Sequence, residues 1–342
     1  MTVTHRHVLC IAAATVAALA VPRSGVAQTA STEPVLSLSK GSGQAYPTRP
    51  LRLIVPFSPG STSEVVARIL GNKLTEQIGQ QVIIDTRPGG LGIIGIEIAK
   101  NAPADGYTLL LAGSTVFTLL PALRSKLSYD PDKDFIALSR LISSSIVIVV
   151  NQALGVGTVA DLVKLAKARP GQLNYGSSGN GSGQHIAAEL FNLLAGVKTT
   201  HVPYKSANLA LPDMIAGQVH FMIVSAPGVM SQVKAGRIKA IATAGATRDP
   251  LLPELPIVAE VLPGYEYTTW SGIAVPAKTP AAIVNKLHSE IVKALQQPDV
   301  REQYAKQGAM AHPESPAEFT TFIKAERSRI ARVGKQVGIT VD

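Results

Sequence analysis

Apolar, strand-like runs alternate with helical patterns along most of this chain of 342 residues. The first run covers residues 51–57, and after it apolar side chains recur every four positions, at Val66, Leu70, Leu74 and Ile78. A spacing of four places such residues on one face of a helix. Nearly continuous apolar strands that alternate with helices are typical of parallel sheets covered on both faces. We therefore expect an α/β fold built on parallel sheets.

The later part of the chain divides this pattern into two domains. Further strand-like runs cover residues 81–85, 107–113, 146–151, 173–177, 199–204, 219–224, 238–244 and 269–275. Helical stretches at 280–297, 298–308 and 316–337 then close the chain, which favours a C-terminal segment that returns to the first domain. We expect domain one to comprise residues 46–145 and 269–342 and domain two to comprise residues 146–268. The two hinge crossings then lie near Ser144-Ser145 and Tyr267-Thr268.

The first 27 residues have the pattern of a secretory signal peptide. Residues 5–7 form a short basic region, and residues 8–21 are apolar. Small residues at 25–27 permit cleavage, with residues 18–20 as a second option. The apolar run is too short to span a bilayer comfortably, although a buried N-terminal helix is an alternative. We expect export to the periplasm with cleavage of the signal.

Composition restricts the mature protein further. Residues 28–45 are small, polar and turn-rich, which is typical of a flexible tether. The only cysteine, Cys10, lies inside the predicted signal, so we expect no disulfide and no thiol chemistry after cleavage. The net charge of +9, which falls to +7 when Arg6 and Arg23 leave with the signal, comes from scattered basic residues without interleaved aromatic side chains, which argues against nucleic-acid binding. A mild positive field favours anionic solutes, and simple solubility explains it equally well.

Ligands of such folds bind beyond the carboxyl ends of the strands, and the residues there are mostly hydroxylic. Two glycine-rich stretches, at 87–95 and 177–185, follow strand-like runs in different halves of the chain and open helical runs. N–H groups at helix starts attract anions, and no arginine clamp is evident. We expect a small organic anion, held by both halves and by water bridges, at Phe57, Pro59, Ser61, Thr62, Ser114, Thr115, Ser177, Gly179, Gly181, Ser182 and Tyr204.

Three other kinds of site fit the sequence less well. Residues 90–95 match the dinucleotide pattern G-x-G-x-x-G, but the next strand does not end in the acidic residue that such a site requires. A serine hydrolase would use His185 or His201 as its base, yet the nucleophile motif G-x-S-x-G fails at Asn180. Two histidines without cysteines are too few for zinc. We expect no cofactor, no metal and no catalysis, with hydrolysis of a small carboxylic ester or amide as the alternative function.

Several sequence blocks carry a family resemblance. Matching blocks include YPTRPLRLIVPFSPG, VIIDTRPGGLGIIGIEIAKNAPADGYTLLL, LSYDPDKDF, NYGSSGNGSGQHIAAELF, HVPYKS and WSGIAVPAKTP. In this order, over residues 46–342, the chain resembles the Bug-type, TctC-like solute receptors of tripartite tricarboxylate transporters. The resemblance implies a type II-like periplasmic binding fold with two α/β lobes around a ligand cleft. It also implies that the receptor, which we expect to be a monomer, delivers its ligand to membrane permease subunits.

The chain departs from the family pattern at four positions. Ser61 and Glu64 stand where the family usually has Gly and Asp, and Ser206 replaces a Gly. Val224 stands at a position where the family often has an acid at the edge of the cleft, so we include it among the ligand-binding candidates. Loss of that acid favours ligands without an ammonium group, because an ammonium group needs a counter-charge. We therefore expect a plain carboxylate, a dicarboxylate or an aromatic acid.

The remaining aromatic and charged residues are expected to have structural roles. Trp270 either stacks on a ring in the ligand or packs beside the hinge, and packing is the expected role. Tyr107 belongs to a turn and the core. The charges of residues 316–335 are expected on a solvated helix face.

Overall fold

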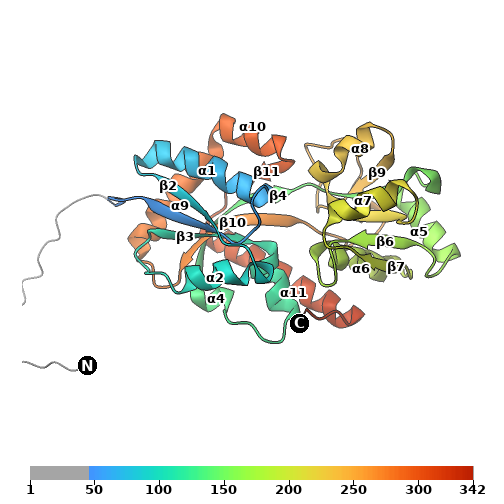
Figure 1. Cartoon of the computed structure of the whole chain (residues 1–342), viewed down its shortest axis with the longest axis horizontal. Coiled ribbons are helices and arrows are strands. Elements are labelled where there is room, and N and C mark those ends of the chain that lie inside the picture. Colours follow the sequence, from blue (N-terminus) through green and yellow to red (C-terminus); the bar gives the residue numbers. More distant parts are fainter. Residues whose placement is uncertain (1–45, 342) are drawn as a thin grey trace, which may run out of the picture. The chain divides into compact units, whose positions relative to one another are not determined.

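The computed structural model describes residues 46–341, and these residues form two mixed β-sheets with helices (Figure 1). The predicted signal peptide, the predicted tether and Cys10 lie outside the described residues. The first sheet has six strands in the order β11-β4-β10-β3-β1-β2, and the second has five in the order β7-β6-β8-β5-β9. The α/β fold class is confirmed, since both sheets are flanked by helices.

The strands are short and mostly buried. In chain order they are β1 (Leu51–Val55), β2 (Val82–Thr86), β3 (Thr108–Gly113), β4 (Phe135–Ser144), β5 (Ile146–Asn151), β6 (Asn174–Ser177), β7 (Thr200–Pro203), β8 (Phe221–Ser225), β9 (Ile238–Thr243), β10 (Thr269–Pro276) and β11 (Ala309–Ala311).

The helices include eleven α-helices and five short η segments within residues 46–341. The α-helices are α1 (Thr62–Ile78), α2 (Ile93–Lys100), α3 (Leu120–Leu123), α4 (Pro131–Asp134), α5 (Val159–Ala168), α6 (Gly183–Ala195), α7 (Ala207–Ile215), α8 (Met230–Lys234), α9 (Ala281–Gln296), α10 (Pro298–Lys306) and α11 (Pro316–Val337). The η segments are η1 (Gly90–Gly92), the π-helical η2 (Thr115–Leu119), η3 (Gln152–Leu154), η4 (Ala226–Gly228) and η5 (Val258–Glu260).

The expectation of purely parallel sheets is wrong, because one central strand in each sheet runs against its neighbours. In the first sheet, β10 is antiparallel to both β3 and β4. In the second, β5 is antiparallel to both β8 and β9. The chain enters the second sheet through β5 and returns to the first sheet through β10. Each of these strands therefore enters its sheet from the end opposite to that at which the neighbouring strands begin. The remaining neighbours are parallel, apart from the short edge strand β11.

Helix caps position the elements that surround the site. Ser61 caps α1 by accepting a hydrogen bond from the Glu64 N–H, and Gly79 ends the helix at φ 68°. A capping box between Ser315 and Glu318 starts α11. α11 packs against η2, α3 and β4 and also against α6, which covers the second sheet, so this single helix contacts elements from both halves of the fold.

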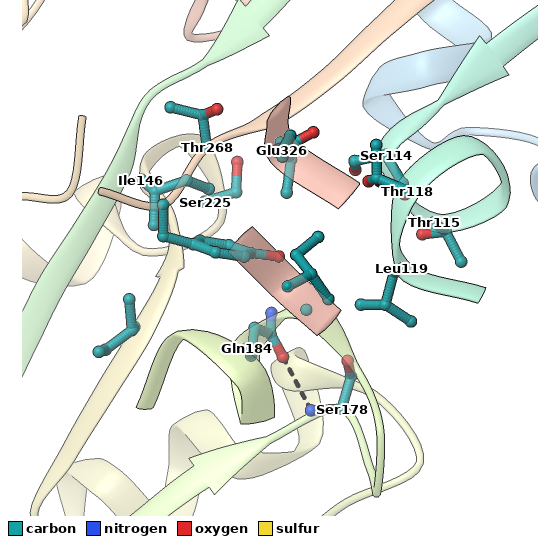
Figure 2. A pocket seen from close by; sticks show the side chains of 15 residues that line it. Ser114, Thr115, Thr118, Leu119, Ile146, Ser178, Gln184, Ser225, Thr268 and Glu326 are labelled. Carbon is teal, nitrogen blue, oxygen red and sulfur yellow. Dashed lines mark hydrogen bonds between the residues drawn. The ribbon is translucent and has the colours of Figure 1, made fainter. Parts of the chain in front are cut away.

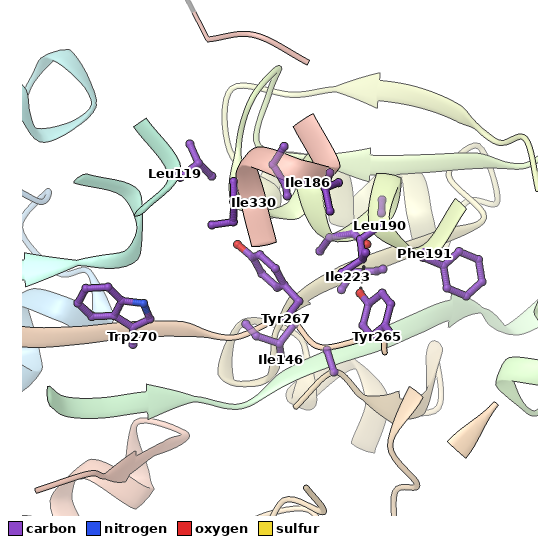
Figure 3. Packing of buried hydrophobic residues seen from close by; sticks show 14 of the residues in the cluster. Leu119, Ile146, Ile186, Leu190, Phe191, Ile223, Tyr265, Tyr267, Trp270 and Ile330 are labelled. Atoms are coloured by element: carbon purple, nitrogen blue, oxygen red, sulfur yellow. Dashed lines mark hydrogen bonds between the residues drawn. The ribbon is translucent and has the colours of Figure 1, made fainter. Parts of the chain in front are cut away.

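One apolar cluster is continuous between the two sheets. It includes Leu119 and Trp270 from the first part of the fold and Ile186 and Ile223 from the second. Tyr267, in the segment before β10, lies between these groups with Ile330 of α11 (Figure 3). A separate cluster packs α1, α9 and α10 against the other face of the first sheet.

Candidate functional site

A cavity with a volume of about 190 Å³ lies where both sheets and α11 meet (Figure 2). Its wall is largely hydroxylic on the side of the first sheet, and the start of α6 closes it on the side of the second. The lining residues are Ser114, Thr115, Thr118, Leu119, Ile146, Ser178, Gly183, Gln184, Ile223, Ser225, Tyr267, Thr268, Thr269, Glu326 and Ile330. We call this space the first cavity.

A second cavity of about 210 Å³ adjoins the first toward the start of α1. The two share Ser114, Thr115 and Thr269, and the second adds Phe57 and Ser63. We call the two adjoining cavities together the joined cavity. Three helix starts therefore face it: α1, the helical segment that opens with η2, and α6. The first N–H groups of a helix have no acceptor within that helix, so such a space suits an anion.

The turn before α1 is held by its own side chains. Glu64 is buried, pairs with Arg68, and accepts a hydrogen bond of 3.3 Å from the Gly60 N–H. Ser61 is occupied as the helix cap, so its hydroxyl already accepts from Glu64. Ser63, which was not among the predicted residues, lines the second cavity and lies 3.1 Å from the Ser271 hydroxyl. Phe57 lines that cavity too, while neither cavity includes Pro59 or Thr62.

The loop before α6 uses its amide groups internally. The Ser178 N–H donates to Gln184 Oε1 at 2.8 Å, and the Gly181 N–H donates to His185 Nδ1 at 3.0 Å. The Gly179 N–H donates to the Ser177 hydroxyl at 3.0 Å. These N–H groups are therefore engaged, and neither cavity includes Ser177, Gly179, Gly181 or Ser182. The neighbouring Ser178, Gly183 and Gln184 line the first cavity in their place.

Two stacked histidines contact this loop: His185 accepts a hydrogen bond from the Gly181 N–H, and His201 contacts Ser177. The rings of His185 and His201 lie 4.0 Å apart, and Tyr175 stacks on His201 at 4.9 Å. Burial, with the adjacent His185, lowers the pKa of His201 to about 4, and burial also lowers the pKa of His185. Ser177 Oγ lies 2.6 Å from His201 Nε2 but has no exposed surface. This serine–histidine pair is thus a buried structural contact, and the hydrolase alternative gains no support from it.

Two predicted residues in the second half of the fold, Tyr204 directly after β7 and Val224 in β8, do not line either cavity. The Tyr204 hydroxyl donates to Asp213 at 2.6 Å. Val224 is 3% exposed and packs in the cluster on the opposite face of β8. Side chains alternate along a strand, so its neighbours Ile223 and Ser225 face the first cavity. The structure therefore places Ser225, and not the predicted Val224, in the wall of the first cavity.

The glycine-rich segment of the first half makes close packing contacts. A side chain on Gly92 would lie 2.7 Å from Val116, and one on Gly95 would lie 2.8 Å from Pro56. Leu91, directly before Gly92, has a left-handed φ of 58°. These glycines let α2 approach the strand ends, which agrees with the packing role expected for them.

Sequence reasoning missed Glu326, which lines the first cavity. The prediction of a solvated face for residues 316–335 is wrong at this position, since Glu326 is 4% exposed. The indole N–H of Trp270 donates to Glu326 Oε2. Burial raises the pKa of Glu326 to about 7, against the lowering effect of the Trp270 hydrogen bond and of nearby Arg329. Glu326 shares one helix face with the apolar residues Phe319, Ile323 and Ile330, and this spacing in the sequence could have indicated that it is buried.

Trp270 takes the packing role expected for it. It is 3% exposed and makes edge-to-face contacts with Phe319 and Phe322 at 5.2 and 5.8 Å. It also lines the second cavity beside Phe57.

Residues 46–341 hold no cluster of three His, Cys, Asp or Glu side chains suited to a metal ion. No helix within this part of the chain is long and apolar enough to cross a membrane.

Comparison with known proteins gives consistent results. Residues 66–339 match the family model described as the tripartite tricarboxylate transporter family receptor. Protein BugT of Bordetella pertussis is 32% identical over 303 residues, which cover 87% of this chain and 92% of BugT. The structure of Rpa4515 from R. palustris with adipate is similar with a TM-score of 0.76 and 34% identity, covering 86% of this chain and 99% of that one. MatC from Rhodopseudomonas palustris with bound malate has a TM-score of 0.70 and 29% identity, covering 84% and 99%.

Proposed function

The chain belongs to the tripartite tricarboxylate transporter receptor family, and on this premise we propose that it captures a small carboxylate in the periplasm. The observation that carries the proposal is the joined cavity space, which residues of both sheets line. Its wall offers hydroxyl groups and three helix starts. Relatives whose structures hold adipate and malate support a carboxylate as the ligand class.

The ligand binds without being changed, and the receptor delivers it to membrane permease subunits. Family membership supports this role, because the family is one of transporter receptors. The buried Ser177 supports it as well, since a nucleophile without exposed surface does not reach a substrate. Export requires the signal pattern of residues 1–27.

Capture involves two lobes that close on the ligand. We assign residues 46–145 and 269–341 to the first lobe and residues 146–268 to the second. The chain passes between the sheets at Ser145, between β4 and β5, and at the segment before β10. Thr268 of that segment lines the first cavity, so hinge motion there changes the shape of the binding space directly.

A melting-temperature screen tests the proposal. The protein is heated with dicarboxylates, tricarboxylates, aromatic acids and amino acids, each in large excess. A ligand at about a hundred times its Kd stabilises the folded state by about 2.7 kcal/mol, which gives a clear shift. Mass spectrometry of the recovered ligand then checks that it is unaltered. Stabilisation by carboxylates alone supports the receptor; a chemically changed ligand contradicts it.

A further inference from the structure

Glu326 is the only charged side chain among the 15 residues that line the first cavity. It extends from α11, shown in red in Figure 1, which contacts both β4 of the first sheet and α6, the helix that packs on the second sheet. Hydroxyl, amide and apolar groups make up the rest of the wall (Figure 2). An acid without a basic neighbour in the wall affects which carboxylates the cavity accepts, because it repels a second negative charge.

The two carboxyl oxygens of Glu326 have different surroundings. Oε2 accepts the hydrogen bond from the Trp270 indole. Oε1 is buried and has no hydrogen-bond partner within residues 46–341. Arg329 forms a long ion pair with Oε1 at 3.8 Å and a closer one with Glu266, so it attracts Oε1 without donating a hydrogen bond to it. A buried acceptor without a partner is costly, so Oε1 is the atom at which a ligand group gains most by donating a hydrogen bond.

The groups around Glu326 do not cancel its charge. Arg329 lies on the same helix, and Glu266 lies in the segment before β10, so one positive charge stands between two acids. Trp270, Tyr267 and Thr118 are the uncharged groups that face it from the other elements. Burial raises the pKa of Glu326, and the Trp270 hydrogen bond and the attraction of Arg329 offset this only in part.

We propose that Glu326 makes the receptor select carboxylates that carry a second, hydrogen-donating group, a hydroxyl or an ammonium, which binds Glu326 Oε1. The inference rests on the proposed carboxylate receptor and narrows its ligand class. It also reverses the expectation drawn from Val224, since the cavity has an acid that comes from α11 and not from β8. A hydrogen bond to a charged group accounts for about a tenfold difference in Kd or more.

Three acids of the same carbon skeleton test this selection: succinate, L-malate and L-aspartate. Calorimetric titration at about pH 8.5, where Glu326 is ionised, should give malate and aspartate a Kd at least about tenfold below that of succinate. At about pH 6.5, a protonated Glu326 donates a hydrogen bond itself, so succinate should bind more tightly and the gap should narrow. This measurement needs no variant. Comparing the Kd of malate with that of aspartate shows whether a hydroxyl or an ammonium group is the preferred donor to Glu326.

Glu326→Gln provides the matched substitution. The Trp270 N–H can only donate, so the amide oxygen must face it and the NH₂ group takes the place of Oε1. An acceptor is thereby exchanged for a donor at the same point. Aspartate should bind about tenfold or more weakly, and succinate should bind more tightly than in the wild type. Glu302→Gln, at a position on α10 whose side chain is 68% exposed, removes the same charge and should change none of the three Kd values.

The outcomes are distinct. Equal Kd values for the three acids in the wild type at about pH 8.5, or unchanged values in a folded Glu326→Gln protein, would overturn this inference and leave the carboxylate receptor intact. No binding of any of the three acids would also overturn it. The wider carboxylate screen then decides separately whether the proposed function itself fails.

Discussion

Glu326 should make the stability of the protein fall as the pH rises through neutrality. Its pKa is raised from 4.5 to about 7 because the carboxyl group is buried. A raised carboxyl pKa means that the folded state holds the proton more tightly than the unfolded state. The stabilisation is therefore complete below about pH 4.5 and is lost as the pH rises to about 7.

The size of this effect follows from the difference between the two pKa values. Each unit corresponds to about 1.4 kcal/mol, so ionising Glu326 in the folded protein costs about 3 kcal/mol. Buried histidines produce the opposite trend, since the lowered pKa values of His201 and His312 destabilise the fold as the pH falls. A pH profile of the wild type alone therefore mixes both contributions.

A comparison with Glu326→Gln isolates the glutamate, because the amide does not titrate. Urea unfolding of both proteins from about pH 4.5 to about pH 8 gives the difference in their free energies of unfolding. This difference should shift by about 3 kcal/mol in favour of the variant as the pH rises. A difference that stays constant across the range would refute the reasoning, since Glu326 would then titrate alike in both states.

Three further predictions concern the loops and the second sheet. Ser63→Ala and Ser182→Ala should each weaken carboxylate binding severalfold in calorimetric titration, because Ser63 lines the second cavity at the start of α1 and Ser182 caps the start of α6; unchanged affinity in both would remove the two-sided clamp. Val224→Asp should destabilise the protein by several kcal/mol in urea unfolding, since an unpaired charge would enter the core of β8; a stable variant would place Val224 at the cleft instead. His201→Phe keeps the stacked ring but removes the contact with Ser177, so it should lower the melting temperature and weaken binding together; a loss of affinity without loss of stability would contradict a supporting role.

The α/β class and most strands could be predicted from the sequence, because buried strands are continuous apolar runs. The helices α9, α10 and α11 also lie close to their predicted ranges. The strand β4 was missed, since Arg140 and several serines interrupt its apolar pattern. Arg140 is buried there because it pairs with Glu314 and lies over Phe322, and such long-range partners are not visible in local periodicity.

The site could be predicted only in part, for a related reason. Ser114 and Thr115 follow a buried strand, so the rule for strand ends located them at the cavity. The rule gave no information about which loop amides are already bonded, and the His185 and Gln184 side chains occupy those before α6. Glu326 lies more than 200 residues from Ser114 along the chain, and only the fold brings the two together.

The position of a bound carboxylate tests the central claim most directly. A crystal structure of the complex with the tightest carboxylate from the screen shows where that ligand lies. We expect it in the joined cavity, in contact with Ser114 on the side of the first sheet and with the start of α6 at Gln184 on the other. A ligand that lies outside this space, or that contacts only one of the two sheets, would contradict the account.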